Sequence, residues 1–393
     1  MYPLSDNIYI QKTDLRNNLT RYNILVIIIS VFSQSGKEKK MKIEKGLTPQ
    51  QALDKRKIRY AATGLLWAAF AALTWAFQGN LMSVAGGMSP FASAAYSAMF
   101  VAVASIVTGA MHDFFAGCWL IIVNLLTGRS LKEYLRLGTT KIGSVMMLAA
   151  FFGGPMATGA SLIGINMCGP TYALAIGATS PIVGAIAGRI MFKERMSPRV
   201  WLGIVIAVAG VLVVSWAPPE GNDYPFFFIG IIAAIFSSIG WGLEGVCCIY
   251  AADMTDSATA CGLYRTFGSC LMTLVILLPV FGGIAGDIGF GFDLIGEAFS
   301  AGTPVIWIIV AALAGGLSYL SIYNAFPRAG AGRSLTVNVT YSLWSIPVGY
   351  LFLALGISNY SITGQAIIGC IVIFLGVVLV IGNPKDLVKL RDN

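Results

Sequence analysis

Charged side chains are scarce in this chain. Asp, Glu, Lys and Arg make up 11% of its 393 residues, whereas soluble domains carry about 25%. Hydrophobic residues reach 56%, and the mean hydropathy is +0.77. Because a chain with so little polar surface cannot cover itself in water, the composition excludes an ordinary soluble domain and predicts an integral membrane protein.

The apolar runs also lack the alternation of apolar and polar residues that is typical of membrane β-barrel strands. They are long, continuous and rich in Gly and Ala. Only helices and closed barrels satisfy the backbone hydrogen bonds in hydrocarbon, so the runs predict an all-α membrane protein. The length of the chain leaves room for ten spans of about 20 residues.

Groups for enzymatic chemistry are equally sparse. His112 is the single histidine, and the seven cysteines fall in or beside apolar runs without the spacing of a zinc site. A phosphate-binding motif is missing, which excludes a nucleotide-driven pump. We therefore expect no enzyme, cofactor, metal site or nucleic-acid partner, and we attribute the net charge of +8 to membrane topology. The cysteines are interpreted as buried thiols.

Residues 1–60 are polar and rich in Lys, and they predict a disordered cytoplasmic tail. Their one apolar stretch, 24–32, is too short to span a bilayer. Met41 offers an alternative start, so the sequence leaves open whether 1–40 belong to the native protein. Residues 383–393 are predicted to form a second cytoplasmic tail.

Lys and Arg are distributed unevenly between the predicted connections. They occupy one alternate set of connections, including Lys55–Arg59 and Arg328 with Arg333, and are missing from 85–90, 164–169, 218–225, 282–303 and 356–360. Because Lys and Arg collect on the cytoplasmic side, both termini are expected there, in a multi-pass protein of the cytoplasmic membrane. The ten predicted spans are 64–84, 91–112, 142–163, 170–190, 200–217, 226–250, 257–281, 304–323, 332–355 and 361–382.

Residues 91–127 are apolar for longer than one span needs and too short for two spans. The polar pair His112-Asp113 interrupts them. We expect the second span to end at this pair, with 114–126 lying along the cytoplasmic interface; a single long tilted helix is the alternative. A role of the pair in proton transfer is the less favoured interpretation.

The two halves of the chain resemble each other at a spacing of 166 positions. An odd number of spans in each half makes the second half enter the membrane from the opposite side, which is an inverted repeat typical of secondary transporters. The predicted units are 61–217 and 226–382. The pairs that share this spacing are Trp75 with Trp241, Gln78 with Glu244, Gly79 with Gly245, Pro181 with Pro347, Gly203 with Gly369 and Gly210 with Gly376.

One stretch of the first unit carries a recognisable pattern. It contains Ala178-Thr179-Ser180-Pro181, Phe192-Lys193-Glu194-Arg195, Trp201-Leu202-Gly203-Ile204 and Ala209-Gly210-Val211-Leu212. This pattern resembles the EamA domain of the drug/metabolite transporter superfamily, and the resemblance covers about residues 64–382. The second unit departs from it by carrying Gly356-Ile357-Ser358-Asn359 in place of the turn with Glu and Arg. The resemblance implies a ten-helix carrier of small metabolites with a central cavity.

We therefore expect a secondary transporter that moves a small metabolite, such as an amino acid, a sugar or a drug-like compound, by alternating access. Its partners are the small-molecule substrate, membrane lipids and a coupling proton or cation, and it is either a monomer or a homodimer. The alternative is a non-transporting sensor or scaffold, and an intramembrane enzyme is a distant third, because Glu244 is judged to be the only carboxylate well inside a span.

Ionisable groups inside spans are costly and therefore indicate function. Glu244 and Arg265 are both expected roughly 9–12 Å from the cytoplasmic side, so they can pair if their helices adjoin. Either they respond to substrate and protons, or they form a salt bridge that only fixes packing. Gln78 is expected at the mirrored depth, as an interhelical hydrogen bond or as part of a cavity.

Further candidates for the substrate path are aromatic or polar side chains inside predicted spans, each of which alternatively fills the core. Pro181 and Pro347 are candidate hinges because proline kinks a helix, although such kinks also arise from packing alone. The path candidates are Trp75, Trp241, Trp344, Tyr264, Tyr319, Tyr323, Asn338 and Tyr341.

Overall fold

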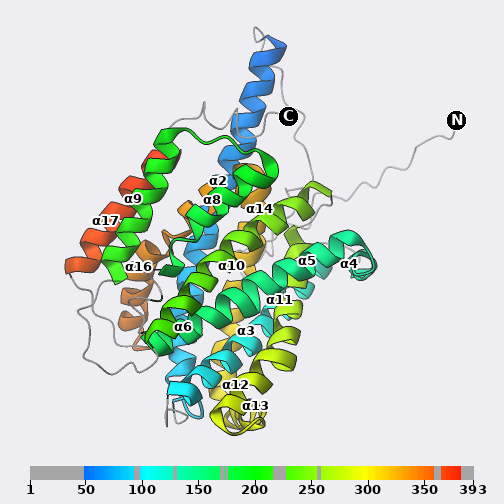
Figure 1. Ribbon diagram of the computed structural model, residues 1–393, viewed down its shortest axis with the longest axis vertical. Helices are drawn as coiled ribbons and strands as arrows, with labels where there is room; N and C mark the ends of the chain where they lie inside the picture. Colours follow the sequence, from blue (N-terminus) through cyan, green and yellow to red (C-terminus); the bar gives the residue numbers. More distant parts are fainter. Residues whose placement is uncertain are drawn as a thin grey trace, which may run out of the picture.

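The computed structural model describes residues 48–92, 98–126, 131–168, 173, 176–215, 227–254, 258–357 and 364–381. Within these ranges the chain is helical and contains no strand, which confirms the predicted all-α class. Many of the helices run obliquely to one another, whereas the first of them runs along the long axis and extends beyond the others at the top of Figure 1.

Seven helical segments of the described residues are long and apolar enough to cross a membrane. Four are single helices, and three are built from consecutive pieces. The single ones are α2 (Pro49–Gly86), α3 (Ala98–Leu126), α10 (Phe227–Met254) and α14 (Thr303–Ala329). The others join α5 (Lys141–Phe151), η2 (Phe152–Gly159) and α6 (Ala160–Cys168); α11 (Ala258–Met272), η3 (Thr273–Leu277) and α12 (Leu278–Ala285); and α15 (Ala331–Asn338) and α16 (Tyr341–Ala354).

Three shorter apolar helices lie where the fourth, fifth and tenth spans are predicted. They are α8 (Ser180–Phe192), α9 (Pro198–Ser215) and α17 (Gly364–Ile381). Because these three are shorter than the other seven, the count of ten spans stays a prediction.

Helix α2 begins upstream of the predicted first span. Thr48 forms a capping box with Gln51, and Pro49 occupies the first helical position, where its missing N–H costs nothing. Residues 49–60 are therefore helical, and their assignment to a disordered tail is wrong. The rest of that predicted tail, and the C-terminal tail, lie outside the described residues.

The predicted end of the second span at His112-Asp113 is also wrong. Helix α3 runs without interruption from Ala98 to Leu126, as the alternative of one long helix requires. Both polar side chains are buried, and Asp113 contacts Arg265 of another helix. Since the carboxylate finds its partner inside the protein, the helix does not have to end in water at this point.

The long connections contain helices of their own. Residues 282–303, predicted as a connection, include the end of α12 and all of α13 (Phe290–Ala301). Glycines with positive φ precede and follow α13, at Gly286 (94°) and Gly302 (72°), where side chains are disfavoured. Similarly, α4 (Leu131–Leu137) lies between α3 and α5.

Helices α9 and α17 cross closely at positions that are occupied by glycine. Helices α9 and α17 lie side by side in Figure 1. A Cβ atom at Gly203 would come 2.7 Å from the carbonyl oxygen of Gly376, and one at Gly210 would come 2.8 Å from that of Gly369. Such small residues let the backbones of membrane helices approach closely.

Replacing Gly210 by Leu is therefore expected to separate α9 from α17 and to destabilise the protein. Overpacking of a close interface costs roughly 1–3 kcal/mol, which lowers the apparent unfolding temperature of the purified protein by several degrees. Gly79→Leu is the matched control, because a Cβ atom at Gly79 meets nothing within 4 Å. Equal unfolding temperatures for the two variants would contradict the prediction.

Candidate substrate cavity

A cavity of about 280 Å³ lies between helices of both halves of the chain. It is bounded by α2, α10, α11, α14 and α15, with the segment around the start of α8 and the first residue of α16. Eight of the predicted path residues line it: Trp75, Trp241, Glu244, Arg265, Tyr319, Tyr323, Asn338 and Tyr341.

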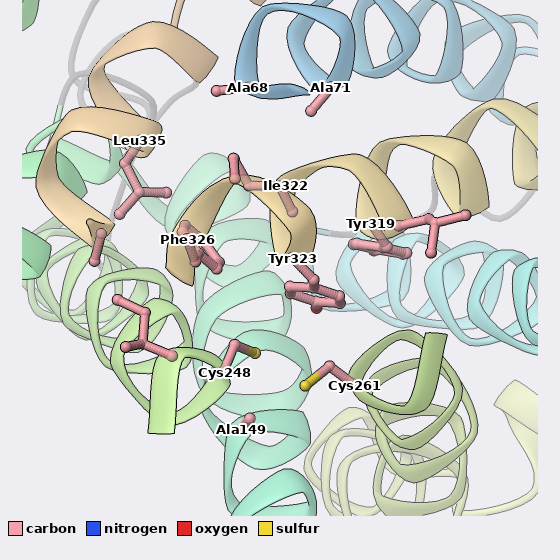
Figure 2. Close-up of a cluster of buried hydrophobic side chains, with 14 of the residues drawn as sticks. Ala68, Ala71, Ala149, Cys248, Cys261, Tyr319, Ile322, Tyr323, Phe326 and Leu335 are labelled. Atoms are coloured by element: carbon pink, nitrogen blue, oxygen red, sulfur yellow. The ribbon is translucent and has the colours of Figure 1, made fainter. Parts of the chain in front are cut away.

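One face of α14 supplies an aromatic wall of the cavity. Tyr319, Tyr323 and Phe326 follow each other at helical spacing and therefore share this face. Figure 2 shows them pointing away from α2, with Tyr323 directed toward Cys248 and Cys261 on the neighbouring helices. The rings of Tyr319 and Tyr323 are stacked, with centroids 6.2 Å apart and an interplanar angle of 10°.

A buried charge network adjoins this wall. Arg265, which is 1% exposed, places Nη1 2.5 Å from Oδ2 of Asp113 and Nε 3.3 Å from Oε1 of Glu244. Two tyrosine hydroxyls complete it: Tyr319 donates to Oδ1 of Asp113 at 3.3 Å, and Tyr323 donates to Oε1 of Glu244 at 2.6 Å. With both carboxylates ionised, the network carries one more negative than positive charge.

The other terminal nitrogen of Arg265, Nη2, is also engaged. Nη2 donates to the carbonyl oxygen of Gly153 at 2.9 Å and to Oγ1 of Thr158 at 3.3 Å, both in the π-helical segment η2. The guanidinium carbon lies 4.6 Å from the ring centroid of Tyr319. The cation is thus held within the protein, whereas Oε2 of Glu244 accepts no hydrogen bond from the described residues.

Gly153 makes room for the Glu244 carboxylate. A Cβ atom at position 153 would lie 2.2 Å from both Cδ and Oε1 of Glu244. In the other half, a Cβ atom at Gly315 would lie 2.2 Å from Nε2 of His112 and 3.3 Å from Cγ of Gln78. Each of these glycines therefore gives space to polar side chains from a neighbouring helix.

Gly153→Ala is expected to displace the Glu244 carboxylate and to disrupt its contact with Arg265. A clash of this kind forces side-chain and backbone shifts. The affinity of the purified protein for its transported substrate should therefore fall at least about tenfold, as measured by equilibrium binding of that substrate. Gly109→Ala, where a Cβ atom meets nothing within 4 Å, serves as the control. Unchanged affinity in Gly153→Ala would show that the glycine is not needed to place Glu244.

Three path candidates do not line this cavity. Gln78 lies beside Gly315 and His112, and the hydroxyl of Tyr264 donates to the carbonyl oxygen of Tyr134 at 2.8 Å. Trp344 is 41% exposed on the outer surface of α16. At positions i, i+3 and i+6 of one continuous helix, Asn338, Tyr341 and Trp344 would lie near one face. Instead, α15 ends at Asn338 and α16 begins at Tyr341, so this spacing does not hold.

The same interruption falls at the cavity wall. Val339 and Thr340 separate α15 from α16, and a turn at 178–179 precedes α8. Pro181 occupies the second position of α8, where proline is tolerated, so it does not kink that helix internally. Pro347 lies inside α16. Interrupted helices are a recurring feature of transporter binding sites.

Asp113 belongs to the buried charge network, although a role of the His112-Asp113 pair in proton transfer was the less favoured interpretation of the sequence. The pattern was interpreted as a helix end, although a carboxylate in the middle of an apolar run is itself a signal of an internal site. Arg333 was likewise expected in a cytoplasmic loop, but it is 1% exposed in the first turn of α15.

Comparison with known proteins agrees with this architecture. Residues 62–216 match the model of the EamA-like transporter family, which confirms the EamA resemblance predicted from the sequence. Together with the apolar helices, the match indicates a multi-pass membrane protein that contains an EamA-like region.

Two relatives extend beyond the matched region. Protein LicB of Haemophilus influenzae is 26% identical over 204 residues, which cover 52% of this chain and 65% of LicB, less than two thirds of that relative. An uncharacterized transporter of Helicobacter pylori is 24% identical over 248 residues, which cover 61% of this chain and 74% of the relative. A crystal structure that is 16% identical superposes with a TM-score of 0.57 over 81% of this chain and 96% of its own, which shows a shared fold.

Proposed function

We propose that this protein is a secondary transporter that carries a small organic cation across the cytoplasmic membrane by alternating access. The observation that supports this most strongly is the cavity of about 280 Å³, which combines aromatic walls with a carboxylate that retains a free oxygen. Aromatic rings attract organic cations through the negative faces of their π-systems, most strongly in desolvated sites.

The occupied guanidinium favours a cation over an anion or an amino acid. A carboxylate-bearing substrate is bound best by a guanidinium with two free donors, but four of the five N–H groups of Arg265 already donate within the protein. Sugars require several polar partners, whereas the cavity wall consists mainly of rings and aliphatic side chains. A positive substrate beside Glu244 would also balance the excess negative charge of the network.

The contacts between helices support two inverted five-helix units. If the units are related by a two-fold axis, each contact between a helix of one unit and a helix of the other must occur twice. In the second contact, each helix is replaced by its equivalent in the other unit. The packing of α2 on α14 has its counterpart in that of α10 on the α5–η2–α6 segment. Likewise, the packing of α16 on α2 has its counterpart in that of α8 on α10.

The glycines of α9 and α17 follow the same symmetry. Gly203 contacts Gly376 and Gly210 contacts Gly369, although the sequence repeat matches Gly203 with Gly369 and Gly210 with Gly376. This reciprocal exchange is the pattern of two equivalent helices crossing on a two-fold axis. We therefore infer ten spans in two units, with α8, α9 and α17 as the three shorter ones.

The charges of the connections support the orientation with both termini in the cytoplasm. The basic start of α2, which includes Lys55 and Arg59, extends from the top of the bundle in Figure 1. Helix α13, with Asp293 and Glu297 but no Lys or Arg, lies at the bottom. Since basic residues are retained in the cytoplasm, the end that carries Lys55 is inside.

The interrupted helices beside the cavity suggest how access alternates. Helices α8 and α15 cross closely. A Cβ atom at Gly332 would lie only 2.6 Å from Cβ of Ala185, so the crossing has no room for a side chain there. This crossing lies on the cytoplasmic side of the turn at 178–179 and of the break at 339–340. We propose that α8 and α15 separate about these breaks to open the cavity to the cytoplasm.

Uptake by proteoliposomes tests the proposed function. The full chain should accumulate a radiolabelled quaternary ammonium ion such as tetramethylammonium, and an excess of tert-butanol, a neutral compound of similar size and shape, should not compete. Strong competition by an amino acid or a sugar would overturn the assignment of a cation. Absence of transport for all of these compounds would favour the sensor or scaffold alternative.

A further inference from the structure

His112 is a buried ionisable group that substrate binding alone does not require. It lies in the middle of α3, is 3% exposed, and places Nδ1 3.3 Å from Oδ1 of Asp113. Its other ring nitrogen, Nε2, has no hydrogen-bond partner among the described residues. Because buried polar atoms are nearly always paired, an unpaired ring nitrogen at this depth calls for an explanation.

The groups that face His112 come from several elements. On its own helix there is Asp113, and from α14 comes Tyr319, whose ring centroid is 6.3 Å from the imidazole and whose hydroxyl donates to Asp113. Helix α11 contributes Arg265, through Asp113, and α2 contributes the uncharged Gln78. In the described contacts, Asp113 is the one carboxylate beside the imidazole.

These contacts form one continuous chain from the histidine to the cavity. His112 contacts Asp113, Asp113 contacts Arg265, and Arg265 contacts Glu244, whose carboxylate lines the cavity. With a neutral imidazole, two carboxylates face one guanidinium. Protonation of His112 adds a second positive charge to the network and removes its excess negative charge.

We propose that His112 is the proton-binding site that couples the transported cation to a proton. The inference rests on the proposed function, since it takes the substrate to be an organic cation held at Glu244. A proton that enters from water binds the lone pair of a ring nitrogen of His112, and the imidazolium then competes with Arg265 for Asp113. Arg265 is thereby left to neutralise Glu244, and the site loses its attraction for the substrate.

The sign of the coupling follows from this arrangement. Proton and substrate are both positive and draw on the same excess negative charge, so each weakens the binding of the other. By linkage, the factor by which the proton lowers substrate affinity equals the factor by which the substrate lowers proton affinity. A carrier built this way exchanges the cation for a proton moving in the opposite direction.

The pH dependence of substrate binding tests the proposal. Histidine ordinarily changes charge between about pH 5 and 8, and coupling between two sites is typically 5- to 150-fold. Binding of radiolabelled tetramethylammonium to the full chain should therefore weaken at least about fivefold between pH 8.5 and pH 5.5. His112→Gln, which keeps a neutral polar side chain, should bind with an affinity that no longer changes over this range.

Proton release provides a second readout, which is compared only where His112→Gln still binds tetramethylammonium and is therefore folded. Near pH 6.5, adding tetramethylammonium to the wild-type protein in weak buffer should release protons, as detected with a pH indicator. Release in the wild type and its loss in His112→Gln support the proposal. A release that persists in His112→Gln assigns the proton to another group and overturns it, as does wild-type binding without any release.

Failure of the inference is distinguishable from failure of the proposed function. If the wild type binds tetramethylammonium with the same affinity at all pH values, the cation carrier stands and the role of His112 is overturned. If it binds no cation at any pH, both the proposed function and the role of His112 are overturned.

Discussion

Glu244→Gln is expected to lower uptake of an organic cation about a hundredfold. The substitution keeps the shape of the side chain but removes the negative charge at the cavity wall. It also leaves Arg265 with a neutral partner in place of a carboxylate 3.3 Å away. Removing one partner of a buried, hydrogen-bonded charge pair costs roughly 2–5 kcal/mol in binding, so radiolabel uptake at low substrate concentration should approach the background of empty liposomes.

Glu297→Gln is the matched control for Glu244→Gln. It makes the same chemical change on the exposed surface of α13, far from the described charge network. We expect uptake by this variant to remain within about twofold of the wild type, because exposed charges contribute little. Normal uptake by Glu244→Gln at normal expression would remove the carboxylate from the substrate site.

Arg265→Gln is expected to have the largest effect on stability. The substitution leaves Asp113 and Glu244 buried without their shared cation, and it removes the donor to the carbonyl oxygen of Gly153. Breaking a buried ion pair from one side costs roughly 3–5 kcal/mol. The variant should therefore unfold at a much lower temperature than the wild type and show no measurable uptake.

A double variant separates the structural role of Arg265 from its role in transport. Adding Asp113→Asn to Arg265→Gln removes one of the two uncompensated carboxylates, so part of the lost stability should return. Uptake should stay absent, because the guanidinium that links Asp113 to Glu244 is still missing. Additive loss of stability in the double variant would contradict a direct interaction between Asp113 and Arg265.

Composition alone was sufficient to predict a membrane protein. In lipid only helices and closed barrels satisfy the backbone hydrogen bonds, which left few possible folds. The pairing of Glu244 with Arg265 was predictable from the sequence as well. Counting residues placed Glu244 and Arg265 at equal depth, and the structure brings Nε and Oε1 to 3.3 Å. Depth along a helix follows from sequence position, since each residue advances the helix by about 1.5 Å.

The position of a side chain around a helix axis was harder to predict. Trp75 and Trp241, matched by the sequence repeat, both line the cavity, whereas Trp344 faces outward. Every face of these helices is apolar, so periodicity does not reveal which face meets the protein and which meets lipid. The repeat pairs the first two tryptophans with each other, whereas helical spacing misplaced Trp344 because the helix is interrupted between Asn338 and Tyr341.

Asp113 shows what single-helix reasoning leaves out. On α3 alone, a His-Asp pair inside an apolar run is most simply explained as the end of a span. Its true partner, Arg265, follows 152 positions later in the sequence, and no local pattern links the two. A buried carboxylate therefore becomes interpretable only when the helix that neutralises it is known.

Counterflow in proteoliposomes tests the central claim most directly. Liposomes that contain the full chain and are loaded with unlabelled tetramethylammonium are diluted into a trace of the labelled ion. If the cavity carries organic cations by alternating access, the label should accumulate transiently inside, and loading with sucrose, a neutral solute that the liposomes retain, should give none. Equal label uptake in cation-loaded, sucrose-loaded and protein-free liposomes would contradict a carrier of organic cations.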